Sequence, residues 1–113
     1  MKNLHSLWDS ILYEFVGTPS MPFSYNDWME LGQNITKMET AFTFNANEWA
    51  TFNATQWAYE SFIMSKETVY ANIKEDDNPS DDYLRISSQL LKRNIVLGGL
   101  RLAQVIIDLY GNK

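Results

Sequence analysis

The sequence contains no cysteine among its 113 residues, and His5 is its only histidine. The absence of cysteine excludes disulfides, and it excludes any zinc site built on thiolates. The imidazole of histidine is another common metal ligand in proteins, and this sequence has only one. A zinc site in this chain therefore has a single imidazole to draw on.

Positive charge is also scarce, since the formal net charge is −5. Lys92, Arg93 and Arg101 lie close together in the sequence, but they are three charges among many acids. A protein that binds nucleic acid by itself usually has a basic face, because phosphate contacts dominate the affinity. A polyanionic ligand would need another source of positive charge, and a bound metal ion is one such source.

Long apolar runs are missing as well. No stretch reaches the roughly 18 apolar residues of a membrane span, and the start of the chain lacks the apolar run of a signal peptide. The content of apolar residues is 45% and that of aromatic residues is 14%, which argues for a packed protein and against disorder. We expect one domain that covers residues 1–113.

Apolar residues recur at helical spacing in four segments, and no segment shows the alternation of a strand. We expect helices from about residue 3 to 15, from 24 to 41, from 45 or 47 to 72, and from 79 to 110. Ser24 and Asp27 suit a capping box at the second helix. Asn78 is expected to cap the fourth helix, with Pro79 at its first position and Gly111 at its end. The predicted fold is all-α, an antiparallel helical bundle.

Two glycines, Gly98 and Gly99, interrupt the apolar face of the fourth predicted helix. Glycine within a helix costs about 1 kcal/mol relative to alanine. We therefore expect close approach of another helix at this point to compensate for the cost.

His5 and Asp9 are four residues apart in the first predicted helix. This spacing places an imidazole and a carboxylate on one helix face, with β-carbons about 6 Å apart. Both groups are good zinc ligands and could hold one ion together. The same spacing also occurs in ordinary surface pairs and in histidines that a carboxylate holds for packing, so spacing alone leaves these alternatives open.

Three segments together resemble one family, and their order and spacing agree across nearly the whole chain. They are N-L-H-x-x-W-D at residues 3–9, W-A-x-E-S at 57–61 with Tyr70 downstream, and G-G-x-R-L-A at 98–103. The family comprises the zinc-dependent single-strand nucleases and 3′-nucleotidases of the S-one/P-one type. It shares an all-helical fold with the zinc phospholipases C.

The resemblance implies roles for two residues and a function for the complete enzyme. His5 and Asp9 would bind one of three zinc ions that hydrolyse single-stranded DNA, RNA and 3′-nucleotides. The other zinc ligands of the family precede the position of Met1, so the chain corresponds to the C-terminal half of the fold. We expect a missing N-terminal portion to complete the site, and we expect this chain alone to be inactive.

The resemblance also suggests supporting residues around the metal ligands. Trp8 is expected to pack behind the helix that carries them. Glu60 would either support His5 through a hydrogen bond, as metal-bound histidines usually require, or form a buried ion pair with Arg101.

Secretion, or a place in the endomembrane lumen, follows from the resemblance alone. Two sequons, beginning at Asn34 and Asn53, could carry glycans in such a compartment. Relatives often have a disulfide-bonded cysteine where this chain has Lys66, so that disulfide is not available here.

Two other interpretations remain open at this point. The small number of metal ligands also fits a non-catalytic helical remnant that acts as a protein-interaction or structural module. A phospholipase-C-like relative is a third possibility, although the matches at residues 57–61 and 98–103 favour the nucleases.

Overall fold

The computed structural model describes residues 3–16 and 21–111, and these residues form helices joined by loops. No strand occurs in the described ranges, so the all-α prediction is confirmed. None of the described helices has both the length and the apolar character needed to cross a membrane. The elements are α1 (Leu4–Val16), α2 (Tyr25–Ala41), the 3-10 turn η1 (Ala46–Glu48), α3 (Ala54–Met64), the π-helical turn η2 (Ser65–Val69) and α4 (Asp81–Tyr110).

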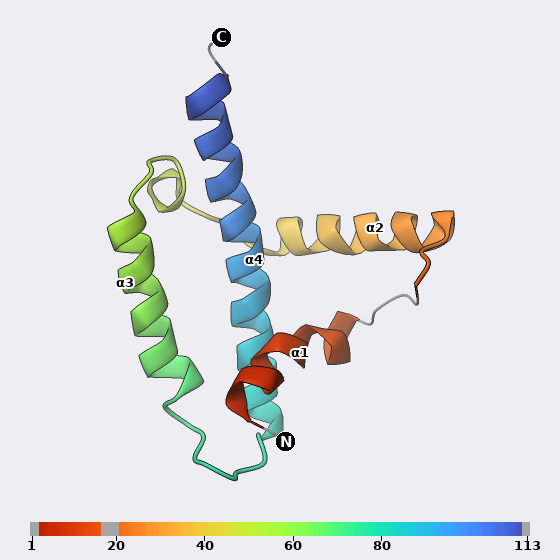
Figure 1. Ribbon diagram of the computed structural model, residues 1–113, viewed down its shortest axis with the longest axis vertical. Coiled ribbons are helices and arrows are strands. Elements are labelled where there is room, and N and C mark those ends of the chain that lie inside the picture. The colour runs from red at the N-terminus through yellow and green to blue at the C-terminus, as the bar shows by residue number, and fades with distance from the viewer. Residues whose placement is uncertain (1–2, 17–20, 112–113) are drawn as a thin grey trace.

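The 30-residue helix α4 is the axis of the molecule, about 45 Å long at 1.5 Å per residue (Figure 1). Helix α3 lies beside α4 and runs antiparallel to it, and α1 crosses the first half of α4. Helix α2 meets α4 with its C-terminal end and extends away from it. At this junction, Met38 of α2 and Phe42, which directly follows α2, line a hollow together with Gln89 and Lys92 of α4.

The start of α2 has the capping box that the sequence predicts. The backbone N–H of Asp27 donates to Oγ of Ser24 at 3.2 Å, and the backbone N–H of Ser24 donates to Oδ2 of Asp27 at 2.7 Å. Both hydrogen bonds lower the pKa of Asp27 below its ordinary value, and the one from the backbone N–H of Ser24 has the larger effect. Two of the backbone groups that a helix start leaves unpaired are satisfied in this way.

The predicted start of α4 is wrong by two residues. The cap is Ser80, whose Oγ accepts a hydrogen bond from the backbone N–H of Tyr83 at 3.1 Å, and Pro79 precedes the helix. With this start, Asp81 and Asp82 both lie in the first turn, where the helix dipole favours negative charge. The end agrees with the prediction, because α4 finishes at Tyr110, directly before Gly111.

The third predicted helix is not continuous. It divides into η1, α3 and η2, with an irregular stretch around Thr51. Asn53 causes the second start, because its side chain accepts a hydrogen bond from the backbone N–H of Gln56 at 3.0 Å. Asparagine competes with the helical backbone for such bonds and therefore favours helix starts over helix interiors.

The core lies along α4, and it is small. Its buried apolar members in the described ranges are Leu7 and Ile11 of α1 and Tyr83 and Leu97 of α4. Ser87 and Ser88 are also buried in α4, at 0% and 2% exposure. Because serine is small, these two positions leave room for neighbouring elements to pack closely against α4.

Gly98 and Gly99 do not mark a close helix contact among the described residues. A Cβ atom added to either glycine would meet no atom within 4 Å. The prediction of a helix packed against this point is therefore wrong for the described part of the chain. Both glycines lie beyond the crossing with α1, in a part of α4 where one side of the helix is bare.

We expect substitutions at two fully buried positions, Ile11 and Ser87, to differ in their effect on stability. Ile11→Ala removes a side chain with 0% exposure and should lower the free energy of unfolding by about 3 kcal/mol. Ser87→Ala removes a buried hydroxyl that has no hydrogen-bond partner in the described structure, and it should leave that free energy unchanged or raise it slightly. Urea unfolding followed by circular dichroism measures both, and a loss of stability in Ser87→Ala would contradict the packing described above.

Candidate metal centre

Asn3 fixes the register of α1. Its side-chain oxygen accepts a hydrogen bond from the backbone N–H of Ser6 at 2.8 Å, and its carbonyl accepts one from the N–H of Leu7 at 3.2 Å. Asparagine is a favoured cap because its oxygen satisfies a backbone donor of the first turn. With this start, His5 lies in the first turn of the helix and Asp9 lies one turn later.

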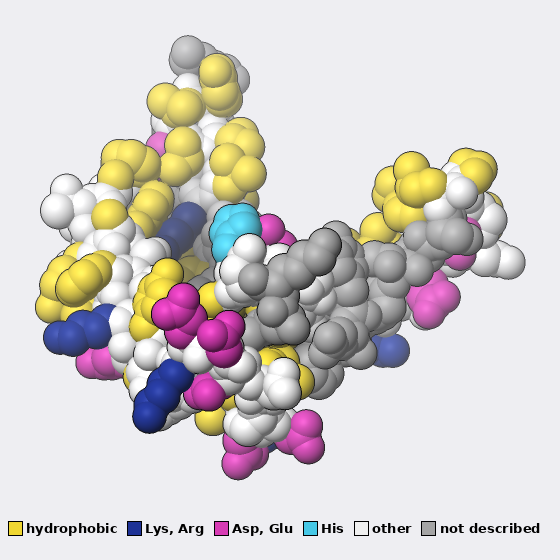
Figure 2. Space-filling view, turned by 60° about the horizontal axis from the view of Figure 1, so that its bottom comes forward, with side chains coloured by type: hydrophobic (Ala, Val, Ile, Leu, Met, Phe, Trp, Pro, Cys, Tyr) yellow, Lys and Arg dark blue, Asp and Glu magenta, His cyan; other side chains and the backbone are white. Residues whose placement is uncertain are grey.

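The side chains of His5 and Asp9 converge. Nε2 of His5 is 3.1 Å from Oδ2 of Asp9, and the two side chains are 87% and 67% exposed. The buried residues Leu7 and Ile11 lie toward the opposite side of α1, so the pair faces outward. Figure 2 shows the imidazole at the surface, beside hydrophobic side chains. The pair is therefore open to an ion from solvent.

The separation of the two side chains suits zinc. Zinc bonds of about 2.0–2.1 Å at tetrahedral angles place two ligand atoms about 3.3 Å apart. The observed 3.1 Å between the imidazole nitrogen of His5 and the carboxylate oxygen of Asp9 is close to this value. One nitrogen and one oxygen are also a donor set that zinc accepts.

The described chain supplies only these two ligands at one place. Among the side chains that the structure describes, no group of three or more histidines, cysteines, aspartates or glutamates could hold a metal ion. A protein zinc site normally has three or four protein ligands. A zinc ion held by His5 and Asp9 would therefore need further ligands from other polypeptide or from water.

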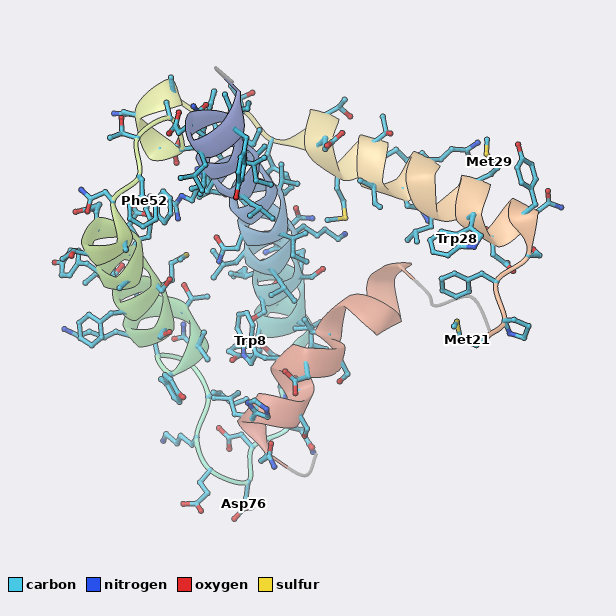
Figure 3. All side chains as sticks on the ribbon, turned by 45° about the horizontal axis from the view of Figure 1, so that its top comes forward. Trp8, Met21, Trp28, Met29, Phe52 and Asp76 are labelled. Carbon is cyan, nitrogen blue, oxygen red and sulfur yellow. The ribbon has the colours of Figure 1, made fainter. Side chains whose placement is uncertain are left out.

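Trp8 holds the helix that carries the pair. Its Nε1 donates a hydrogen bond to the hydroxyl of Tyr83 at 3.0 Å, and that hydroxyl donates to the carbonyl of Val69 at 2.8 Å. The rings of Trp8 and Tyr83 meet edge to face, with centroids 6.4 Å apart. Figure 3 shows Trp8 directed from α1 toward α4. This chain of contacts links α1, α4 and η2.

Glu60 forms an ion pair with Arg101. This ion pair was one of the two alternatives that the sequence left open for Glu60, and a hydrogen bond to His5 was the other. Oε2 of Glu60 accepts a hydrogen bond from Nη2 of Arg101 at 2.6 Å. Nε of Arg101 donates to the carbonyl of Glu48 at 2.9 Å, and the guanidinium lies 4.6 Å from the ring centroid of Trp57. The described residues show no hydrogen bond between Glu60 and His5, so we assign Glu60 to the fold and not to the support of His5.

A second arginine, Arg93, lies eight residues before Arg101 in α4, about two helical turns away, and makes a similar set of contacts. Nη2 of Arg93 donates to Oε1 of Glu48 at 2.6 Å, and its guanidinium lies 4.6 Å from the ring centroid of Phe44. The backbone N–H of Asn45 donates to the other carboxylate oxygen of Glu48 at 2.9 Å. The bond from Arg93, followed by that from Asn45, lowers the pKa of Glu48. Both arginines therefore already have carboxylate partners.

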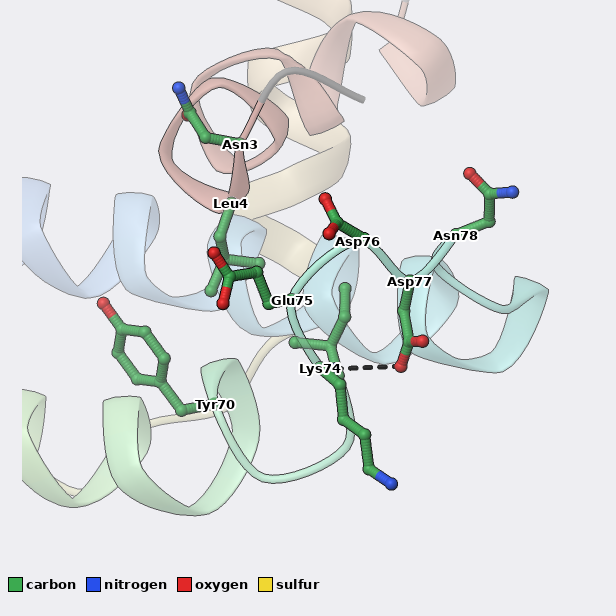
Figure 4. Close-up of a pocket in the computed structure, with 9 residues that line it drawn as sticks. Asn3, Leu4, Tyr70, Lys74, Glu75, Asp76, Asp77 and Asn78 are labelled. Atoms are coloured by element: carbon green, nitrogen blue, oxygen red, sulfur yellow. Dashed lines mark hydrogen bonds between the residues drawn. The ribbon is translucent and has the colours of Figure 1, made fainter.

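A hollow of about 390 Å³ lies beside the start of α1 (Figure 4). Asn3 and Leu4 form one side of it, and the connector from Ile73 to Asn78 forms the other. The backbone N–H of Lys74 donates to Oδ2 of Asp77 at 2.9 Å, which closes a turn in this connector. Nothing in the sequence placed residues 74–78 next to the neighbours of His5.

A family model described as S1/P1 Nuclease matches residues 1–111 of the chain. The match contains all three segments on which the resemblance was based, and it includes His5 and Asp9. No curated protein and no solved structure matches the chain.

The contact between Glu48 and Arg93 makes stability depend on pH. Because the pKa of Glu48 is lowered on folding, its contribution is fully present above the ordinary value of 4.5 and is lost as the pH falls through the folded value. Glu48→Gln should therefore lower the free energy of unfolding at pH 7 by about 1–2 kcal/mol. The difference from the unsubstituted protein should shrink as the pH is lowered below 4.5.

Thermal unfolding between neutral and acidic pH measures this difference. Glu39→Gln is the matched control, because Glu39 is exposed on α2. A difference for Glu48→Gln that stays constant down to acidic pH would show that the carboxylate charge is not its origin.

Proposed function

The chain belongs to the S1/P1 nuclease family, and we propose that it takes part in the zinc-dependent hydrolysis of single-stranded nucleic acids and 3′-nucleotides. In this proposal, His5 and Asp9 bind one zinc ion. The observation that carries it is the 3.1 Å contact between their exposed ligand atoms, which is close to the spacing of two ligands of one ion. The family match extends over both residues and supports the same assignment.

The chain's own contribution is to hold and orient the ion. The neutral imidazole of His5 donates a nitrogen lone pair, and the carboxylate of Asp9 supplies a negative oxygen. The hydrogen bonds from Trp8 through Tyr83 to Val69 fix the helix from which both ligands project. When bound, zinc supplies a nucleophilic water at neutral pH and stabilises charge on the oxygens of the phosphate.

The proposal also accounts for binding of a polyanion by an acidic chain. The formal net charge is −5, and Arg93 and Arg101 are already paired with carboxylates. Clustered zinc ions would provide the positive charge that the described side chains do not offer to phosphate. The other ligands would come from the N-terminal portion of a family member, and the nucleic acid would bind to the completed site.

Zinc binding by this pair can be measured directly on the chain. His5 is the only histidine, so its imidazole gives a single set of signals in a nuclear magnetic resonance spectrum. We expect addition of zinc to shift these signals, and we expect Asp9→Asn to weaken the binding by at least about tenfold. Asp108→Asn is the matched control, because Asp108 is an exposed carboxylate near the far end of α4.

Catalysis is tested by mixing the chain with an N-terminal fragment of a relative. The mixture should cleave single-stranded DNA when zinc is present, and His5→Ala and Asp9→Ala should abolish cleavage, whereas Asp108→Asn should not. A folded mixture that binds zinc but stays inactive would contradict the proposed activity. Parallel assays with a 3′-nucleotide and with phosphatidylcholine separate a nuclease from a phospholipase-C-like enzyme.

We also propose that the protein is secreted or lies in an endomembrane lumen, and that Asn53 carries a glycan there. Asn53 is exposed at the start of α3, and its side-chain oxygen caps the helix while its nitrogen remains available. Asn34 is half-buried on α2 and is the less accessible sequon. Expression through a secretory pathway should yield protein whose mass falls on treatment with an N-glycosidase, and Asn53→Gln should remove this effect.

A further inference from the structure

The hollow at the junction of α2 and α4 has the features of a binding site for a small molecule. It lies where the C-terminal end of α2 meets α4 (Figure 1). Its volume is about 270 Å³, slightly below the roughly 300–1,000 Å³ of sites that hold drug-sized ligands. We call it the α2–α4 hollow, and the side chains that give it its chemistry are Asn34, Lys37, Met38, Phe42, Gln89 and Lys92.

The charged side chains that line the α2–α4 hollow are all positive. Lys37 comes from α2 and Lys92 from α4, and no aspartate or glutamate is among the described residues that line the hollow. The chain as a whole has 14 acidic residues and a net charge of −5. Two cations from different helices, with no acid beside them, therefore distinguish this place from the average surface of the protein.

Both lysines lack a carboxylate partner within the described part of the chain. The arginines of α4 differ in this respect, because each of them forms an ion pair with a glutamate or an aspartate. Neither Lys37 nor Lys92 forms an ion pair with a described residue. Lys92 is also half-buried, and partial burial strengthens its attraction to an opposite charge because less water screens it. The two ammonium groups are available to an anion from solvent.

The end of α2 brings a smaller charge of the opposite sign to the α2–α4 hollow. The last carbonyl groups of a helix are equivalent to about −0.5 elementary charge. Phe42, the C-cap of α2, is one of the lining residues, so these carbonyls lie near the hollow. The two lysines together supply two positive charges, which exceed this contribution. The hollow therefore favours an anion.

The uncharged side chains indicate what else the anion carries. Asn34 and Gln89 offer amide N–H groups that can donate to oxygen atoms, and neither side chain has a hydrogen-bond partner among the described residues. Met38 and Phe42 are half-buried and offer an apolar surface in the same hollow. A matching ligand combines negatively charged oxygens with an apolar group.

We propose that the α2–α4 hollow binds a small phosphomonoester that carries an apolar group. A phosphomonoester has about 1.5 to 2 negative charges at pH 7 and three acceptor oxygens. The charges of Lys37 and Lys92 match this number, whereas a monocarboxylate would leave one ammonium group without an opposite charge. The amides of Asn34 and Gln89 donate to phosphate oxygens, and Phe42 contacts the apolar group.

This inference does not rest on the proposed nuclease function. The α2–α4 hollow contains neither His5 nor Asp9, which lie on α1, so its lysines add no positive charge at the candidate metal centre. Two charges match one phosphate group and not a nucleic acid strand, whose binding involves many phosphate contacts. Binding to the hollow is measured without zinc, so its failure and the failure of zinc-dependent cleavage are separate results.

Titration of the full chain with phenyl phosphate in the absence of zinc tests the site. We expect a dissociation constant of about 1 mM or below, measured by nuclear magnetic resonance. The methyl signal of Met38 should shift during the titration, because Met38 lines the hollow. The signals of His5, the only histidine, should not move.

Substitution of the two lysines tests their role in binding. Lys37→Gln and Lys92→Gln each remove one charged donor and should weaken binding of phenyl phosphate about tenfold. Lys66→Gln is the matched control, because Lys66 is exposed on η2, forms no ion pair with a described residue and does not line the hollow. It should leave binding unchanged. Circular dichroism checks that all three variants remain helical.

Two further ligands separate the charge of the ligand from its apolar group. Benzoate has the same ring as phenyl phosphate but one negative charge, and it should bind at least about tenfold more weakly. Inorganic phosphate has the charge without the ring, and it should also bind more weakly because the contact with Phe42 is lost.

Four results would overturn the proposal. The first is the absence of binding of phenyl phosphate up to about 10 mM. The second is an equal loss of affinity in Lys66→Gln and in the two variants of the hollow. The third is binding of benzoate as tight as that of phenyl phosphate. The fourth is a titration that shifts the signals of His5 and leaves the methyl signal of Met38 in place.

Discussion

The crossing of α1 over α4 is the constraint on which the rest of the structure depends. Leu7 and Ile11 of α1 have buried side chains, and Tyr83 of α4 is buried as well and contacts Trp8 of α1. The hydrogen bonds from Trp8 to the Tyr83 hydroxyl and from that hydroxyl to Val69 orient α1 relative to α4, which apolar contacts alone do not do. They fix the rotation of α1 about its own axis, and His5 and Asp9 face outward as a result.

A second set of contacts attaches the middle of the chain to α4 by charge. Arg93 and Arg101 reach from one helix to Glu48 and Glu60, which are 45 and 41 residues away in sequence. Each guanidinium also lies over an aromatic ring, so its flat face and its N–H groups are both used. Apolar burial is sparse in this part of the molecule, so these contacts determine where η1 and α3 lie against α4.

Local features of the sequence were sufficient to predict the helices but not all of their ends. The capping box of Ser24 and Asp27 involves neighbouring residues and was predicted correctly. Asn78 and Ser80 both precede α4 and both suit a cap, and only the structure shows that Ser80 is used. The long third helix was a wrong prediction because its apolar residues continue through the break before Asn53.

The candidate site was only partly accessible to sequence reasoning, for a similar reason. The spacing of His5 and Asp9 is a local property, so the sequence could predict that both side chains share a face. The contact between Glu48 and Arg93 joins distant segments, and no periodic pattern reports it. The predicted close approach at Gly98 and Gly99 depended on a partner helix that the described residues do not provide.

The hollow beside Asn3 and Leu4 has a consequence for the direction from which ligands arrive. Glu75, Asp76 and Asp77 gather on its far side, within the same hollow as the two residues that precede His5. A concentration of carboxylates produces a negative electrostatic potential, which attracts divalent cations and repels phosphate backbones. If the chain binds zinc and nucleic acid as proposed, this potential would draw the metal ion toward this end of α1 and would steer a nucleic acid strand to approach from another side.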